Sequence, residues 1–255
     1  MPAPADLMPD ILAPLAGRIP TVPPGVRLYA IGDVHGRLDL FHQIERQIER
    51  DAAAAPGLRH VQVMLGDYID RGPESRGVIA HLMARRSGRE LVTLRGNHEL
   101  FMLDLDPVDV PNWCRYGGRQ TLASYGLDLS DLDEAAIEAS VPDVIGRVRT
   151  VLPADHAAFL ASTRLSWRCG DYLFVHAGIR PGVALAAQDP RDLVWIRRDF
   201  LDHDGDHGLV VVHGHTPTPE PEIRRNRIGI DTKAYESGRL TCLVLEGDTQ
   251  RFLTT

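Results

Sequence analysis

Side chains that can bind divalent metal ions recur beside glycine in five short segments of this chain. The candidates, in chain order, are Asp33, His35, Asp67, Asp70, Asn97, His98, His176, His213 and His215. A single Gly-Asp or Gly-His pair is usually a turn or a helix cap, but five such segments in one chain favour a shared site. Carboxylate, imidazole and carboxamide groups without a thiolate are ligands for manganese, iron, zinc or cobalt. The sequence therefore predicts a site for a divalent metal ion.

Each of these segments follows a short apolar run that is typical of a buried strand. The runs are 27–31, 60–65, 90–94, 172–175 and 209–212. A helix is predicted after the first run, because Leu40, Ile44 and Ile48 share one face and charged residues take the other. A second helix is expected from about Glu74 to Arg86, which gives a βαβ order. Ligand sites in such folds gather at the carboxyl ends of strands, so the candidate side chains should meet there.

The rest of the chain divides into an arm, an insertion and a β-rich end. Residues 1–25 hold seven of the 18 prolines and are expected to form a loosely ordered arm over the domain. The strand pattern disappears in residues 101–167, where helices are predicted over 133–140, stopped by Pro142, and over 153–162. Further strands are predicted over 228–231, 240–245 and 251–253. We therefore expect one α/β (α+β) domain that spans residues 1–255, with a helical insertion at about 101–167 bordering the site.

Composition and charge exclude several classes of protein. The 255 residues are 44% hydrophobic and 25% charged, which is typical of a globular chain. The net charge of −7 lacks the basic excess that non-specific binding to nucleic acids or anionic membranes needs. No apolar run reaches the roughly 18 residues that span a bilayer. The three cysteines are far apart and predict neither a disulfide framework nor a thiolate zinc site. The N-terminus lacks the basic start of a signal peptide, so we expect a cytoplasmic protein.

Five motifs, in this order and spacing, resemble those of the phosphoprotein phosphatase family, the metal-dependent serine/threonine phosphatase branch of the calcineurin-like phosphoesterases. They are GDVHG at 32–36, GDYIDRG at 66–72, RGNHE at 95–99, HAG at 176–178 and GHTP at 214–217. The resemblance extends from about residue 27 to residue 246. It implies a calcineurin-like metallophosphoesterase fold, a central β-sandwich flanked by helices with the site at its edge.

The resemblance also implies two divalent metal ions that share Asp67. The further ligands that it implies are Asp33 and His35 for the first ion, and Asn97, His176 and His215 for the second. Manganese is the expected metal, with iron, zinc or cobalt as alternatives. His213 lies outside this set, because the family's histidine ligand directly precedes Thr-Pro. Its role is left open between strand-end packing and support of a ligand.

In the mechanism that the resemblance implies, a hydroxide that bridges the two ions attacks phosphorus in line, opposite the departing alkoxide. Arg71 and Arg197 would bind the phosphate oxygens. His98 would protonate the leaving oxygen, and Asp70 would orient His98 and hold its proton. The predicted function is therefore hydrolysis of phosphoserine and phosphothreonine in proteins, with phosphotyrosine as a further substrate.

Three other functions are alternatives to this prediction. Hydrolases of symmetrical dinucleoside tetraphosphates share the catalytic motifs and form the main alternative. A binding module with a dead site is disfavoured, because all six ligand positions are filled. A nucleic-acid phosphodiesterase is disfavoured by the acidic charge balance and by Pro217, which stands where the wider superfamily often has a further histidine and so favours phosphomonoesters. The expected partner is a phosphorylated protein or peptide, and we expect no nucleic acid, membrane or regulatory subunit.

One departure from the family pattern lies near the C-terminus. Bacterial relatives often have Asp-Thr-Gly-Ala where this chain has Asp231-Thr232-Lys233-Ala234. The chain thereby loses the backbone freedom of glycine at this position. Two roles are left open for Lys233, a positive charge near the phosphate and stabilisation of its own loop.

Overall fold

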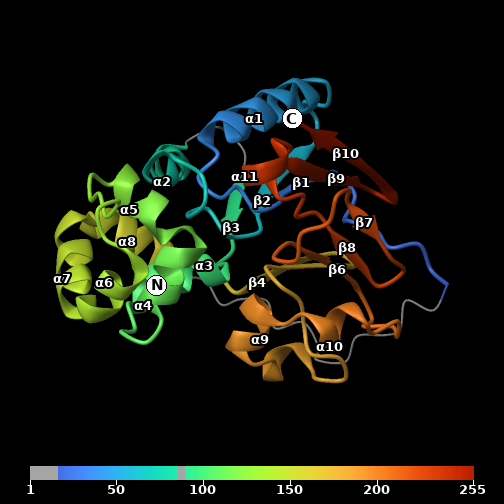
Figure 1. The fold of residues 1–255 in the computed structure, drawn as a ribbon. Helices are drawn as coiled ribbons and strands as arrows, with labels where there is room; N and C mark the ends of the chain where they lie inside the picture. Colours follow the sequence, from blue (N-terminus) through green and yellow to red (C-terminus); the bar gives the residue numbers. More distant parts are fainter. Residues whose placement is uncertain (1–16, 86–89) are drawn as a thin grey trace, which may run out of the picture.

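Two five-stranded sheets pack face to face at the centre of the protein (Figure 1). The computed structural model describes residues 17–85 and 90–255. The first sheet has the strand order β10-β9-β1-β2-β3. Its strands are β1 (Val26–Ile31), β2 (Arg59–Met64), β3 (Glu90–Thr93), β9 (Thr241–Glu246) and β10 (Thr249–Thr254). β1, β2 and β3 are parallel, whereas β9 is antiparallel to both β1 and β10.

The second sheet has the order β4-β5-β6-β8-β7. Its strands are β4 (Ser166–Cys169), β5 (Tyr172–Val175), β6 (Val210–His213), β7 (Glu222–Ile223) and β8 (Arg227–Gly229). β5, β6 and β8 are parallel, and β4 and β7 add antiparallel edges. The predicted strands of both sheets are confirmed with shifts of a few residues at their ends. The edge strands β4 and β7 were not predicted, because both are short and neither has an apolar alternation.

Alternate side chains of a strand divide between two apolar layers. Leu28 and Ala30 of β1 belong to the core between the sheets, together with Phe174 of β5. Tyr29 and Ile31 of β1 belong to the core between the first sheet and its helices. The apolar run predicted as a buried strand is therefore buried on both faces.

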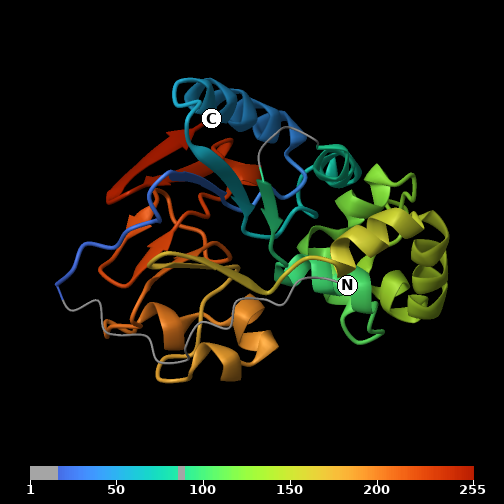
Figure 2. The same cartoon turned by 180° about the vertical axis from the view of Figure 1, so that it is seen from behind.

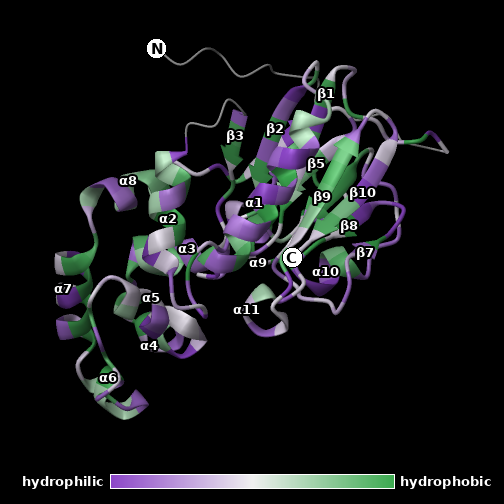
Figure 3. Cartoon of the chain, turned by 90° about the horizontal axis from the view of Figure 1, so that it is seen from above, coloured by the Kyte–Doolittle hydropathy of each residue, from purple (hydrophilic) through white to green (hydrophobic). Residues whose placement is uncertain are grey.

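Helices cover the outer face of each sheet, which gives four layers (Figure 2). α1 (Leu38–Ala53) and α2 (Ser75–Ala84) cover the first sheet, and α9 (Pro190–Trp195) and α10 (Arg198–Leu201) cover the second. Figure 3 shows the mixture of hydrophilic and hydrophobic residues along α1, whose apolar side is buried. The short helix α11 (Ala234–Ser237) precedes β9. This sandwich flanked by helices confirms the predicted fold class.

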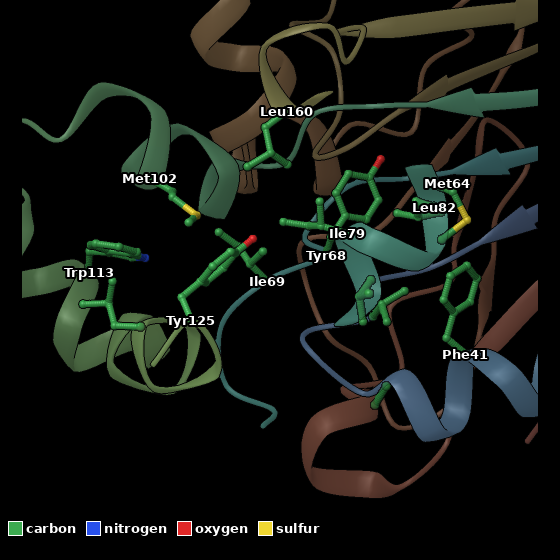
Figure 4. Packing of buried hydrophobic residues seen from close by; sticks show 14 of the residues in the cluster. Phe41, Met64, Tyr68, Ile69, Ile79, Leu82, Met102, Trp113, Tyr125 and Leu160 are labelled. Carbon is green, nitrogen blue, oxygen red and sulfur yellow. The ribbon is translucent and has the colours of Figure 1, made fainter. Parts of the chain in front are cut away.

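A helical region connects β3 to β4. It contains α3 (Asn97–Asp104), α4 (Val110–Trp113), a π-helical turn (Cys114–Gly118), α5 (Arg119–Ser124), α6 (Glu134–Ala139), α7 (Val141–Val151) and α8 (Ala154–Ala161). Its apolar side chains join those beneath α1 and α2 in one cluster, which includes Phe41, Ile79 and Trp113 (Figure 4). The helical region is thus packed onto the sandwich through a continuous core.

The helical region differs from the sequence prediction in several places. Helices occupy residues 97–104 and 110–124, and the predicted break is confined to residues 105–109, which contain Pro107. Pro111 does not break the chain but lies in the first turn of α4. The predicted helices over 133–140 and 153–162 are confirmed as α6 and α8. A further helix, α7, was not predicted; Pro142 lies in its first turn, where a proline needs no N–H to donate. β4 begins at Ser166, just before the expected end of the insertion. The predicted end of the second helix, Arg86, lies outside the described residues.

The described part of the N-terminal arm connects turns of both sheets. The backbone N–H of Thr21 donates to the carboxylate of Asp171 at 2.9 Å, and that of Val22 donates to the carbonyl of Gly247 at 2.9 Å. Residues 1–16 of the predicted arm lie outside the described residues. Among the helices of residues 17–85 and 90–255, none combines the length and the apolar character needed to cross a membrane.

Candidate active site

The loops that follow β1, β2, β3, β5 and β6 meet at one edge of the sandwich. The backbone carbonyl of Asp67 accepts hydrogen bonds from the N–H groups of Val34 at 3.2 Å and His35 at 2.8 Å, which joins the first two loops. The carbonyl of His176 accepts a bond from the N–H of Gly214 at 2.8 Å, which joins the last two. Strand ends therefore bring together side chains that are far apart in the sequence.

Asp67 belongs to two groups of buried ligand atoms. One group is Asp67, His35 and His98, and the other is Asp67, His176 and His215; within each, the ligand atoms lie within 4.8 Å of one another. Oδ2 of Asp67 lies 3.5 Å from Nε2 of His35, and Oδ1 lies 3.4 Å from Nε2 of His176. The two oxygens of one carboxylate thus face different groups, an arrangement that allows Asp67 to hold two ions.

The remaining sequence-predicted ligands, Asp33 and Asn97, lie beside these groups. Oδ1 of Asn97 is 3.0 Å from Nε2 of His176. Oδ2 of Asp33 accepts the backbone N–H of His215 at 2.9 Å, while its Oδ1 is buried without a hydrogen-bond partner among the described residues. Nε2 of His215 is also buried without one. Because such atoms are costly to leave unpaired, they indicate that a cation is the missing partner.

Backbone carbonyls orient two of the histidines. Nδ1 of His35 lies 2.8 Å from the carbonyl oxygen of Ile69, and Nδ1 of His176 lies 2.9 Å from that of Leu65. Because a carbonyl only accepts hydrogen bonds, each Nδ1 must carry the proton, which leaves a lone pair on Nε2 toward Asp67. Metal-binding histidines in proteins are commonly held in this way.

The charges of the cluster also fit divalent cations. Burial raises the pKa of Asp33 well above its usual value, and the charges of Asp231 and Asp67 raise it further. Burial likewise raises the pKa of Asp67 and lowers the pKa of His176 to about 4. A bound cation stabilises ionised carboxylates and neutral imidazoles. The donor set of this site therefore fits a pair of divalent metal ions.

Left-handed backbone conformations are concentrated at the site. Seven described residues other than glycine have a positive φ, and five of them are site residues with φ between 45° and 71°, namely His35, Asp67, Asp70, Arg71 and His215. Each such conformation costs on the order of 1–3 kcal/mol. In an extended segment Asp33 and His35 would point the same way by alternation, which is what the spacing of the first motif predicts. This prediction is wrong, because a left-handed turn at His35 directs its side chain.

Buried hydrogen bonds hold His98. Nδ1 of His98 lies 2.6 Å from Oδ2 of Asp70. Asp70 also accepts bonds from the indole N–H of Trp113 at 2.9 Å and the hydroxyl of Thr121 at 2.6 Å. Burial lowers the pKa of His98, but the charges of Asp67 and Asp70 outweigh it and raise this pKa to about 9. His98 is therefore oriented by Asp70 and can carry a proton.

Sequence reasoning missed three of the residues that support this site. Trp113, taken as a packing residue, and Thr121 lie 43 and 51 residues from Asp70, and no local pattern links them to it. Glu99 accepts the backbone N–H groups of Gly96 at 2.8 Å and Asp67 at 2.9 Å, which fixes two of the loops. Glu99 belongs to the RGNHE motif, so its position in that motif was the available signal.

Asp231 is a further carboxylate that sequence reasoning did not assign. It is 4% exposed, and its charge acts on Asp33. Burial raises the pKa of Asp231 to about 6. Its Oδ1 accepts the backbone N–H of Lys233 at 2.8 Å, so it also fixes the loop before α11.

Arg71 is held between two aromatic rings. Its guanidinium carbon lies 5.5 Å from the ring centre of Tyr116 and 5.3 Å from that of Tyr235. Its Nε is buried without a hydrogen-bond partner among the described residues. The backbone N–H of Arg71 donates to the carbonyl of Gly117 at 3.4 Å, and a Cβ at Gly117 would stand only 2.4 Å from this nitrogen. The helical region therefore fixes the backbone and the side chain of Arg71.

Arg197, the second predicted arginine, is exposed at the start of α10. Burial lowers the pKa of His215, and the nearby charges of His176 and Arg197 lower it further. Arg197 thus adds positive charge on the His215 side of the site.

His213 and Lys233 make local contacts. His213 belongs to neither ligand group, its Nδ1 lies 3.1 Å from the carbonyl oxygen of Gly214, and its ring packs edge-on against Phe200 at 5.1 Å. Lys233 has a φ of 56°, and its ammonium lies 2.6 Å from the carboxylate of Glu236. Packing for His213 and loop stabilisation for Lys233 therefore fit these contacts.

Known proteins similar to this chain include relatives named as nucleotide hydrolases and relatives named as protein phosphatases. A protein from Anoxybacillus flavithermus named bis(5'-nucleosyl)-tetraphosphatase PrpE (asymmetrical) is 27% identical over 236 residues, which cover 84% of this chain and 88% of that protein. Serine/threonine-protein phosphatase 1 from Salmonella typhimurium is 28% identical over 234 residues, which cover 84% and 89%. The crystal structure of a candidate diadenosine tetraphosphatase has a TM-score of 0.60 at 20% identity, and the match covers 92% of this chain and 98% of that one, which shows a shared fold.

A family model described as calcineurin-like phosphoesterase matches residues 26–243, which is most of the chain. The matched span includes every residue of the two buried ligand groups. The members of this family are hydrolases that use divalent metal ions. The family match and the geometry of the site agree, and the chain belongs to the calcineurin-like phosphoesterase family.

Proposed function

We propose that this chain is a phosphomonoesterase that uses two divalent metal ions, manganese first among them, to remove phosphate from phosphoserine and phosphothreonine in proteins, and also from phosphotyrosine. The observation that carries the proposal is the 2.6 Å contact of His98 with Asp70, next to the ligand groups of Asp67. A serine or threonine alkoxide is a poor leaving group, so its ester needs a proton donor at the leaving oxygen. A nucleoside phosphate is a better leaving group and needs that donor far less. Hydrolases of dinucleoside tetraphosphates share the motifs of His98 and Asp70, so the comparison of the two substrates below, and not this contact alone, distinguishes the functions.

The proposed ligands are Asp33, His35 and Asp67 for one ion, and Asp67, Asn97, His176 and His215 for the other. When bound, such ions polarise the phosphoryl oxygens and make water a stronger nucleophile. The hydrogen bonds from Nδ1 of His35 and His176 keep the Nε2 atoms directed toward Asp67. Glu99 keeps the Asp67 backbone in place through its bond to the Asp67 N–H.

The remaining site residues act on the phosphate and on the leaving group. Arg71 and Arg197 bind the non-bridging phosphate oxygens, and stacking between two tyrosines fixes the direction of the Arg71 guanidinium. His98 donates its Nε2 proton to the leaving oxygen while Nδ1 stays bonded to Asp70. These roles require no covalent bond between the chain and the phosphate.

A phosphoserine peptide and diadenosine tetraphosphate, assayed side by side with manganese, test the proposal. We expect a higher kcat/KM for the peptide, and no activity after the metal is removed by a chelator. A preference of about 100-fold for the nucleotide, which corresponds to about 2.7 kcal/mol of transition-state discrimination, would contradict the proposal.

Hydrolysis of dinucleoside tetraphosphates is the second candidate function, and the name of the Anoxybacillus relative supports it. The Salmonella relative, a protein phosphatase by name, is similar to the same degree, at 28% identity against 27%. The products identify the mode of cleavage, since symmetrical hydrolysis of diadenosine tetraphosphate gives two molecules of ADP and asymmetrical hydrolysis gives ATP and AMP.

A further inference from the structure

A pocket of about 530 Å³ lies beside the candidate active site. Phe101, one turn after His98 on α3, lines this pocket, and its ring centre lies 6.0 Å from that of His98. Trp195, at the end of α9, lines it as well and lies 5.6 Å from Phe101 and 6.0 Å from His215. The two aromatic rings therefore separate the pocket from the proposed proton donor and from one of the ligands.

A third aromatic residue connects the pocket to the proposed phosphate site. Tyr116 lines the pocket, and its ring is one of the two that hold the guanidinium of Arg71. Pocket-lining residues therefore contact both proposed groups, because Tyr116 contacts Arg71 and Phe101 contacts His98. In the proposed mechanism His98 protonates the leaving oxygen, so the part of the substrate that carries this oxygen would extend toward the pocket.

The rim of the pocket on the helical side is acidic. Asp104, Asp106 and Asp109, which we call the acidic rim, line the pocket at the end of α3 and in the segment before α4. All three are exposed, and none forms an ion pair with a described residue. Asp106 accepts the backbone N–H of Val108 at 2.9 Å, whereas Asp104 and Asp109 make no side-chain hydrogen bond among the described residues. Their charges are available to a ligand.

Two guanidinium groups line the same pocket without pairing with the acidic rim. Arg95 donates to the hydroxyl of Thr163 at 3.0 Å and to the carbonyl of Ala161 at 2.7 Å, at the base of the helical region. Arg191 lies on α9, which covers the second sheet, and not on the helical region. The three carboxylates therefore outnumber the guanidinium groups and stand together on one side.

We propose that this pocket binds the residues that flank phosphoserine or phosphothreonine in a protein substrate, and that it selects segments with a basic residue there. This specificity rests on the proposed function. The aromatic wall packs against the aliphatic stem or the guanidinium plane of an arginine, and the acidic rim pairs with its charge. The leaving nucleotide of a dinucleoside tetraphosphate would instead bring negative charge to the three carboxylates.

Matched phosphoserine peptides test this specificity. One peptide carries two arginines after the phosphoserine, a second carries them before it, and twins of both carry glutamates at the same positions. We expect KM to be about fivefold lower for the better arginine peptide than for its glutamate twin, since each exposed ion pair contributes little. The kcat values should be equal, and about 0.5 M NaCl should remove most of the difference.

The double variant Asp104→Asn/Asp109→Asn provides the second measurement. It should lose most of the preference for arginine while kcat/KM for p-nitrophenyl phosphate, which has no flanking residues, stays unchanged. The double variant Asp131→Asn/Glu138→Gln is the matched control, because it also removes two negative charges, but from exposed positions of the helical region that do not line the pocket. This control should keep the lower KM for arginine peptides that we expect of the unmodified protein.

Three results would overturn the proposed specificity for basic residues. Two of them leave the proposed function standing: equal KM values for the arginine peptides and their glutamate twins, and an unchanged preference for arginine in Asp104→Asn/Asp109→Asn. The third is cleavage of diadenosine tetraphosphate without hydrolysis of any phosphopeptide, which would overturn the proposed function and, with it, the specificity for basic residues.

Discussion

Replacing Trp113 by phenylalanine should slow the hydrolysis of phosphoserine much more than that of p-nitrophenyl phosphate. The indole N–H of Trp113 donates to both carboxylate oxygens of Asp70, at 2.9 and 3.2 Å, in the buried core. Phenylalanine retains most of the apolar packing but has no donor. Asp70 then orients His98 less firmly, and the reaction that depends most on proton donation suffers most.

The size of the effect follows from these hydrogen bonds. A bond to a charged group contributes about 1.5–3 kcal/mol, and about 1.4 kcal/mol is a factor of ten in rate. We therefore expect kcat for a phosphoserine peptide to fall about 10–100-fold. Thr121 still donates to Asp70 at 2.6 Å, so the loss should stay below that of His98→Asn, about 10²–10⁴-fold. For p-nitrophenyl phosphate, whose leaving group needs little protonation, a loss of about threefold or less is expected.

The assay compares kcat for the two substrates at saturating manganese. Tyr125→Phe is the matched control, because it removes a buried hydrogen bond of 2.8 Å, to His156, from the same core without a contact to Asp70. Thermal unfolding checks that both variants are folded. Because Trp113 acts through His98, the double variant His98→Asn/Trp113→Phe should be no slower than His98→Asn alone. Equal losses on both substrates, or additive losses in the double variant, would refute this reasoning.

Three more predictions follow from the site. Gly117→Ala should raise KM for a phosphoserine peptide about tenfold or more, because the new Cβ would stand 2.4 Å from the backbone nitrogen of Arg71 and displace it. Gly146→Ala is the control: its new Cβ would have no neighbouring atom within 4 Å, so KM should be unchanged. With a chelator present, the free energy of unfolding measured in urea should fall between about pH 6.5 and about pH 9. The pKa of His98 is raised from 6.5 to about 9, so in this range the folded state holds a proton that the unfolded state has released. Manganese should flatten this pH dependence, and a flat curve with the chelator would contradict the raised pKa of His98. Lys233→Gly should raise Tm by a few degrees, since glycine adopts the φ of 56° without the cost of on the order of 1 kcal/mol; a lower Tm would mean that the ion pair with Glu236 outweighs that cost.

Features encoded within one short segment were predictable from the sequence. Apolar runs mark the strands, and the Gly-Asp and Gly-His segments that follow them mark the loops that meet at the site. Parallel neighbours in a sheet place these loops at one edge, so the sequence predicts that Asp33, Asp67 and His176 lie together. The structure places them in one buried cluster.

Features that depend on packing between distant segments were not predictable. Trp113 and Thr121 reach Asp70 across 43 and 51 residues, and only the fold of the helical region brings them there. α7 was missed because Pro142 was taken only as the end of one helix, although a proline also fits the first turn of the next. The left-handed turn at His35 depends on hydrogen bonds to the Asp67 loop, which a local alternation pattern does not contain.

The candidate ligands come from both halves of the sandwich. Asp33, Asp67 and Asn97 follow strands of the first sheet, whereas His176 and His215 follow strands of the second. An ion held among them is therefore a non-covalent cross-link between the sheets. Such an ion would make opening of this edge rarer, and amide hydrogen exchange along β5 and β6, measured with and without manganese, would test this.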